Sequence, residues 1–71
     1  MPAEMKVEEF QQRVIKEKVE LDSKIQRLVA FTTTRIFMAL DDAEKGRLQY
    51  QCDAMYLYSR ILGDRIAAFH G

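Results

Sequence analysis

Apolar residues between positions 4 and 31 recur in steps of three, four or seven, which is the spacing of one helix face. They are Val7, Phe10, Val14, Leu21, Ile25 and Leu28. This spacing predicts one amphipathic helix over about residues 4–31. Its apolar stripe must be covered by another element, so the chain is expected to build a helical core around this segment.

Three consecutive threonines at residues 32–34 end this pattern. β-Branched hydroxyl residues disfavour the helix and tend to form local side-chain to backbone hydrogen bonds. We therefore expect a connection over residues 32–41, in which the apolar stretch 35–40 is either a turn of helix or a loop. This stretch is expected to fold back and to cover the end of a hairpin with Phe37 and Leu40.

A second helix is predicted over about residues 42–69. Asp41 can accept hydrogen bonds from the first backbone amides of this helix. Glu44, three residues later, is expected to reach back and accept from the backbone N–H of Asp41, as in a capping box. The predicted fold class is therefore all-α. We expect a single domain over residues 1–71, consisting of an antiparallel two-helix hairpin with a short helical or loop connection.

The second helix is apolar on more than one face. One seam, suited to cover the first helix, holds Leu48, Cys52, Met55, Leu62, Ile66 and Phe69. Outside this seam lie Tyr50, Ala54, Leu57, Tyr58, Ile61, Ala67 and Ala68. A helix that is apolar nearly all round is normally buried on several sides. Gly63 inside this helix is either a tolerated imperfection or a point where a neighbouring helix approaches closely.

Self-association is the remaining way for so short a chain to enlarge its core. A domain of this size buries only about 60% of the surface that its unfolded chain exposes. The 71 residues include one cysteine and one histidine, so neither an intrachain disulfide nor a four-ligand zinc site can form. We therefore expect the hairpin to assemble with copies of itself into a homo-oligomeric helical bundle.

The sequence disfavours duplex DNA as a partner by its charge, and a membrane by its lack of a long apolar stretch. The formal net charge is zero and the pI is near 6.6, whereas proteins that bind polyanions normally carry a basic excess. Residues 1–9 are too acidic and polar for a signal peptide. No apolar stretch approaches the roughly 20 residues that a membrane-spanning helix needs. The sequence therefore predicts a cytosolic protein.

No set of residues suited to catalysis is recognisable. The chain has no glycine-rich phosphate loop, no nucleophile elbow and no cluster with metal-ligand spacing. His70 is the penultimate residue, and Cys52 falls on the apolar seam, where a cysteine usually acts as a small hydrophobic residue. We expect no enzyme activity, no cofactor and no metal.

A binding site is the better-supported expectation. Tyr50, Tyr56 and Tyr58 offer aromatic faces for stacking on a base. Candidate phosphate ligands are Lys24, Arg35, Arg60 and Arg65, assisted by the hydroxyls of Thr33 and Thr34. The alternative is structural, because tyrosines at helical spacing are often interface core and single arginines are often solvated or paired with Asp53 and Asp64.

A pattern of apolar and polar residues extends over nearly the whole chain. Its first half comprises Arg13-Val14-Ile15, Glu17-Lys18, Glu20-Leu21-Asp22, Lys24-Ile25, Leu28 and Phe31. Its second half comprises Phe37, Leu40, Leu48, Gln51, Met55, Tyr58-Ser59, Ile61-Leu62-Gly63, Arg65-Ile66 and Phe69. Together these residues resemble a family of small helical-hairpin proteins of tailed bacteriophages, related to a crAss-like phage protein, and the shared motifs are mainly structural.

In size, neutrality and helical make-up the chain is also similar to phage sponges that sequester nucleotide signals of the CBASS and Thoeris defences. This looser resemblance implies a partner that is a small anionic nucleotide, such as a cyclic dinucleotide, a cyclic trinucleotide or a cyclic ADP-ribose isomer. It also implies action in the cytoplasm of the infected bacterial host. The alternatives are a phage inhibitor or adaptor that places an apolar helix face on a host protein, and a structural part of the virion.

Overall fold

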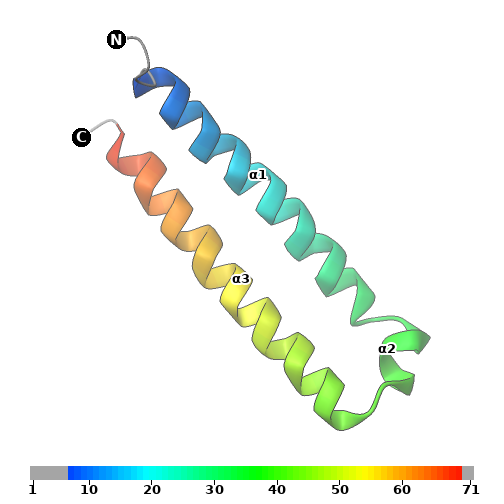
Figure 1. Cartoon of the computed structure of the whole chain (residues 1–71). Coiled ribbons are helices and arrows are strands. Elements are labelled where there is room, and N and C mark those ends of the chain that lie inside the picture. The colour runs from blue at the N-terminus through cyan, green and yellow to red at the C-terminus, as the bar shows by residue number, and fades with distance from the viewer. Residues whose placement is uncertain (1–6, 70–71) are drawn as a thin grey trace.

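The chain folds into three helices in a computed structural model that describes residues 7–69. They are α1 (Val7–Phe31), α2 (Arg35–Ala39) and α3 (Asp42–Ala68). The two long helices lie side by side and antiparallel, and α2 turns the chain at one end (Figure 1). The predicted all-α hairpin is confirmed, and its connection contains a turn of helix. Residues 4–6, where the first helix was expected to begin, lie outside the described residues.

The end of α1 is fixed by the threonines at residues 32–34. Each hydroxyl donates a hydrogen bond to the carbonyl oxygen three residues earlier, over 2.6 to 2.7 Å. The same three carbonyl oxygens also accept from the threonine backbone N–H groups over 3.0 to 3.1 Å, which is the tighter three-residue pattern of a helix end. The hydroxyls therefore add a second hydrogen bond to each carbonyl, and α1 ends where the threonines begin, as the sequence predicted.

Each of the following helices begins at a side-chain cap. The backbone N–H of Phe37 donates to Thr34 Oγ1 over 3.2 Å, and the N–H of Glu44 donates to Asp41 Oδ1 over 2.8 Å. The Asp41 cap was predicted, but the reciprocal half of the capping box differs. The Glu44 carboxylate accepts from Arg47 Nε over 2.7 Å, because a guanidinium is a stronger donor to a carboxylate than a neutral amide.

The closed end of the hairpin is covered by Phe37, as expected. Its ring packs edge-on against Phe31 with 6.0 Å between ring centroids and an interplanar angle of 86°. The Lys45 ammonium lies 5.8 Å from the centre of the same ring, and Leu40 is half-buried nearby in sequence. These contacts connect α1, α2 and the first turn of α3, so the connection is packed against both long helices.

The core is a single narrow seam between the long helices. Val14, Leu21 and Ile25 of α1 are buried with Leu62 of α3, the one large side chain among the described residues that is completely buried. The predicted α3 seam residues Met55, Ile66 and Phe69 pack against this cluster, and Cys52 is buried as expected. The seam therefore uses one face of each helix.

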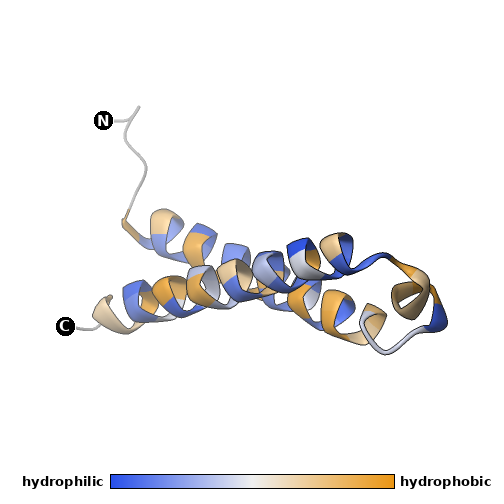
Figure 2. Cartoon of the chain, turned by 90° about the horizontal axis from the view of Figure 1, so that it is seen from below, coloured by the Kyte–Doolittle hydropathy of each residue, from blue (hydrophilic) through white to orange (hydrophobic). Residues whose placement is uncertain are grey.

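Most large apolar side chains remain outside this core. The hairpin is 54 Å long but only 22 and 17 Å across, which leaves room for two helices and no third layer. Hydrophobic residues consequently lie on outward as well as inward surfaces of both helices (Figure 2). The exposed ones are Val7, Phe10, Ile15, Val19, Val29, Ile36, Met38, Tyr50, Tyr56, Leu57, Tyr58 and Ile61.

Close packing within the hairpin does not require a glycine at position 63. A Cβ built there meets only Lys18 Cε, at an ordinary contact distance of 3.4 Å. At Gly46, which also lies in α3, a Cβ meets nothing within 4 Å. One interpretation of Gly63 was that it allows a neighbouring helix to approach closely. If so, that helix is not α1.

Replacing Gly63 by alanine is expected to stabilise a hairpin that has no further neighbour at this position. Alanine is favoured over glycine in a helix by up to about 1 kcal/mol, and Gly46→Ala is the matched control. Both gains are measured by urea unfolding at one protein concentration. If Gly63→Ala destabilises the protein while Gly46→Ala does not, another copy of the chain approaches α3 at Gly63.

Removing the side chain of Leu62 should open the core. Leu62→Ala is expected to lower the free energy of unfolding by about 2–5 kcal/mol, because a fully buried leucine leaves a cavity. Val19→Ala, on an exposed position of α1, is the control and should cost less than about 1 kcal/mol. Equal losses for the two variants, measured by urea unfolding, would contradict the assigned core.

Candidate functional site

A closed cluster of three polar side chains interrupts the apolar seam. Lys18 Nζ donates to Asp22 Oδ2 over 2.9 Å and to Ser59 Oγ over 2.8 Å, and the Ser59 hydroxyl donates to Asp22 Oδ1. Ser59 is buried, and the other two side chains are partly exposed. The triangle therefore connects α1 to α3 through charged and neutral hydrogen bonds.

The sequence contained a signal for this cluster that was not used. Lys18 follows Val14 by four residues and precedes Leu21 by three, so it occupies an α1 seam position. Ser59 stands in the same relation to Met55 and Leu62 on α3. Polar residues at seam positions of both helices indicate that they meet, because a buried polar group needs a partner.

The cluster perturbs the acidity of its carboxylate. Hydrogen bonds from the Ser59 hydroxyl and from the Lys18 ammonium hold the pKa of Asp22 below its ordinary value of 3.8. All three side chains find partners within the cluster, which leaves no obvious demand for a ligand. We therefore assign it to fixing the alignment of α1 against α3.

The lowered pKa of Asp22 gives a pH dependence of known sign. A carboxyl group that is more acidic in the folded chain stabilises the fold while ionised, and this contribution is lost as the pH falls through the lowered pKa. The stability difference between the wild type and Asp22→Asn should therefore shrink as the pH falls from above 3.8 to below the lowered pKa. Urea unfolding across this range measures it, with Glu20→Gln as the control. A difference that is constant with pH would contradict the role of Asp22.

The three predicted tyrosines are exposed on different sides of α3. Their exposed fractions are 76% for Tyr50, 54% for Tyr56 and 43% for Tyr58. Successive helix residues are rotated by about 100°, so Tyr56 and Tyr58 project from opposite flanks of the helix. Tyr50 projects away from α1. Consequently, one chain does not bring two of these rings together around one ligand.

The predicted cations are also distributed, and they are free of salt bridges. Residues 7–69 contain two salt bridges, Lys18–Asp22 and Arg47–Glu44, and neither involves any of the four cations predicted to bind phosphate. Those four are Lys24, Arg35, Arg60 and Arg65.

Each tyrosine flank of α3 carries one of these arginines. Arg60 lies one turn after Tyr56 on the same flank. Arg65 lies two turns after Tyr58 on the other flank, and its guanidinium carbon is 5.6 Å from the centre of the Phe10 ring. Within α3, the predicted site residues therefore share a flank as two pairs, Tyr56 with Arg60 and Tyr58 with Arg65.

The predicted residues at the hairpin end have other partners. The hydroxyls of Thr33 and Thr34 donate to the carbonyl oxygens at the end of α1, and Thr34 Oγ1 also caps α2. A phosphate oxygen accepts hydrogen bonds, so it would have to displace these carbonyl groups to use either hydroxyl. Arg35 is exposed at the first position of α2. Of the three predicted residues at the closed end of the hairpin, it is the one whose side chain is available to bind a phosphate.

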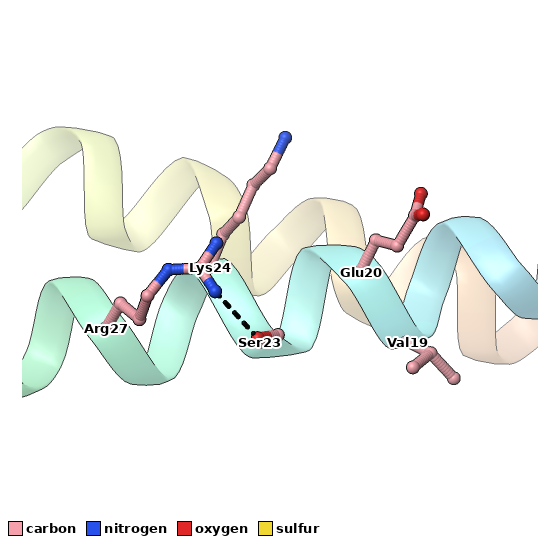
Figure 3. A pocket seen from close by; sticks show the side chains of 5 residues that line it. All are labelled: Val19, Glu20, Ser23, Lys24 and Arg27. Carbon is pink, nitrogen blue, oxygen red and sulfur yellow. Dashed lines mark hydrogen bonds between the residues drawn. The ribbon is translucent and has the colours of Figure 1, made fainter.

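Lys24 lies beside a shallow depression on the outer face of α1. Figure 3 shows the five lining residues, all from this one helix, with Lys24 and Glu20 extending into solvent. Arg27, which was not among the predicted site residues, lies next to Lys24 and donates to Ser23 Oγ over 3.0 Å. A depression on one helix encloses no ligand, so these two cations require a second surface to form a site.

The described residues form neither a metal-binding cluster nor a membrane-spanning helix. Within positions 7–69, no three His, Cys, Asp or Glu side chains gather as metal ligands would, and His70 lies outside this range. No helix in the same part of the chain combines the length and the apolar character needed to cross a bilayer.

Comparison with known families decides what kind of protein has this fold. The model of the Sequestin family matches residues 8–68, which include both long helices and their connection. The chain belongs to the Sequestin family. Sequestin proteins are phage anti-defence proteins that act by sequestration, so the family is one of binding proteins and not of enzymes. No curated protein and no solved structure matches the chain.

Membership of the Sequestin family indicates a signal-sequestering role in phage anti-defence. It agrees with the sequence-based expectation of a phage protein that binds without catalysis. The matched range includes Tyr50, Tyr56 and Tyr58 together with the four predicted cations. Their roles in binding stay predictions, because a family match assigns no ligand to a residue.

Proposed function

We propose that this Sequestin family protein sequesters a cyclic nucleotide or an ADP-ribose-type immune signal without cleaving it. The bound signal is withheld from host defences of the CBASS or Thoeris kind in the cytoplasm of the infected bacterium. Family membership supports the sequestering role. The class of ligand rests on one observation, the four cations without a salt bridge in a formally neutral chain.

The charges favour a small anion over a long polyanion. A neutral chain does not attract nucleic acid over a distance, but unpaired arginines and lysines can bind individual phosphates through charge-assisted hydrogen bonds. Exposed tyrosine rings next to such cations provide the apolar face that a base needs. The flank of α3 that carries Tyr56 and Arg60 combines the two, and we propose it as the primary contact with the signal.

Tight binding by this surface requires more than one chain. A hairpin two helices wide exposes its tyrosines and cations on separate faces, whereas small-molecule sites are concave and bury most of the ligand. We therefore propose that the protein acts as a homo-oligomer with sites formed between subunits. Stacking contributes about 1–3 kcal/mol per base. Charge-assisted phosphate contacts contribute about 1.5–3 kcal/mol each. Two bases and two phosphates therefore contribute about 5–12 kcal/mol before the cost of association, so nanomolar affinity, near −12 kcal/mol, also needs the additional burial that a site between subunits provides.

A thermal-shift screen tests the proposed ligand class. The wild-type protein is incubated with cyclic dinucleotides, cyclic trinucleotides and cyclic ADP-ribose isomers. A ligand present at a hundred times its dissociation constant should stabilise the fold by about 2.7 kcal/mol. The bound compound should be recovered unchanged after heat denaturation. If no compound stabilises the protein, the nucleotide proposal is wrong and an apolar face that binds a host protein becomes the better explanation.

Variants of the α3 flank locate the site. Tyr56→Ala and Arg60→Gln should each weaken binding of the best compound by about tenfold to a hundredfold, through loss of stacking or of a phosphate contact. Tyr56→Phe keeps the ring and is the matched control, expected to bind within a few-fold of wild type. Calorimetric titration measures the affinities, and light scattering checks assembly. Full affinity in both variants would show that the site lies elsewhere.

A further inference from the structure

The outward face of α3 carries a second seam with a regular pattern. Its positions follow one another in alternating steps of four and three residues, which is the spacing of a coiled-coil contact face. All eight side chains are exposed in the hairpin. This outer seam consists of Ala43, Arg47, Tyr50, Ala54, Leu57, Ile61, Asp64 and Ala68.

The outer seam is complementary to itself when it is reversed. Counted inward from its two ends, alanine is matched with alanine, and Arg47 with Asp64. The next positions match Tyr50 with Ile61, and the innermost match a small residue, Ala54, with a large one, Leu57. An interface between identical subunits related by a two-fold axis requires this property, because each patch must fit its own copy.

We propose that two copies of the chain pair through the outer seams of their α3 helices, antiparallel, to form a four-helix dimer. The two-fold axis passes between Met55 and Tyr56. Arg47 of each copy keeps its Nε on Glu44 of its own chain, over 2.7 Å, and its remaining guanidinium N–H groups face Asp64 of the other copy. The apolar layers of both copies lie between these two charge pairs. This pairing goes beyond signal binding and names the surface of the proposed homo-oligomer.

The charges beside the seam agree with this arrangement. In an antiparallel pair of helices, residues that flank the contact face meet the same kind of flanking position on the partner. This places Asp53 of one copy on the same side as Arg60 of the other, and Glu44, which also holds Arg47 of its own chain, on the same side as Arg65. In the empty dimer these carboxylates balance the two arginines, and a bound phosphate would take their place. A parallel pair would instead place Arg47 on Arg47 and Asp64 on Asp64, which is repulsive at both positions.

The pairing also assembles aromatic residues that one chain keeps apart. The Tyr58 residues of the two copies lie on the same side of the joined helices. Measured along the helix axis, they are separated by the rise of five residues, roughly 7.5 Å. Arg65 of each copy lies on that side as well. The dimer therefore creates a surface with two tyrosines and two arginines, which neither copy provides alone.

Charge reversal at the ends of the outer seam tests this proposal without any ligand. Arg47→Asp and Asp64→Arg should each weaken self-association, because each variant places like charges at both ends of the dimer. When mixed, the two variants should form a heterodimer in clear excess over either homodimer, since all end pairs become complementary. The double variant in one chain should restore the homodimer. Native mass spectrometry measures each species.

The centre of the seam offers a second test with a matched control. Leu57→Glu should raise the dimer dissociation constant at least about tenfold. Val19→Glu, at an equally exposed apolar position of α1, should leave it unchanged. Both positions are exposed in the hairpin, so circular dichroism should show wild-type helix content. Single reversals that dimerise normally, a mixture without heterodimer preference, or dissociation by Val19→Glu in place of Leu57→Glu would each overturn the proposal.

Failure of this proposal is distinguishable from failure of the proposed function. The charge-reversal experiment reports on the α3 interface in the absence of nucleotide, whereas the thermal-shift screen reports on ligand binding by the wild-type chain. A protein that binds nucleotide but ignores charge reversal sequesters its signal through another interface. A protein that responds to charge reversal but binds no nucleotide has the α3 dimer and a different ligand.

Discussion

The rest of this structure depends on how much apolar surface two helices can bury against each other. A hairpin of two helices gives each helix one neighbour, so each can bury only one face. α1 uses its face to cover Leu62 and the residues around it. α3 has a second apolar face on the opposite side, with Tyr50, Leu57 and Ile61 exposed. The proposed assembly and the proposed sites between subunits both depend on how this second face is covered.

The polar cluster complements this apolar packing. Apolar seams of similar side chains can slide against each other by one helix turn, whereas hydrogen bonds between Lys18, Asp22 and Ser59 have defined partners. With the alignment of α1 and α3 fixed, the flanks of α3 are fixed too. Tyr56 with Arg60 and Tyr58 with Arg65 then project on opposite sides of the same helix.

The sequence predicted those parts of the fold that depend on local interactions. The two helices, the threonine stop and the Asp41 cap follow from residues within a few positions of one another. The partner of Glu44 was predicted wrongly, because the choice between a backbone amide and Arg47 depends on competing donors. The Lys18 and Ser59 contact could have been predicted from seam spacing, but the predicted seams comprised apolar residues only.

The candidate site could be predicted only as a set of residue types. Helical geometry determines which side of α3 each tyrosine occupies, and this separates Tyr56 from Tyr58. In the proposed oligomer, the residues that come together around a ligand depend on the neighbouring subunit, which the sequence of one chain specifies only through complementarity. The outer seam shows that such complementarity can be read once the exposed positions are known. In the sequence alone this seam is hard to recognise, because its charged residues Arg47 and Asp64 interrupt an otherwise apolar pattern.

Sedimentation equilibrium of the unmodified protein at micromolar concentration tests the central claim most directly, namely that another copy covers the second face of α3. The account predicts an average mass of at least twice the 8.3 kDa of one chain, falling toward the single-chain value on dilution. A well-folded single chain of 8.3 kDa throughout the micromolar range would contradict it.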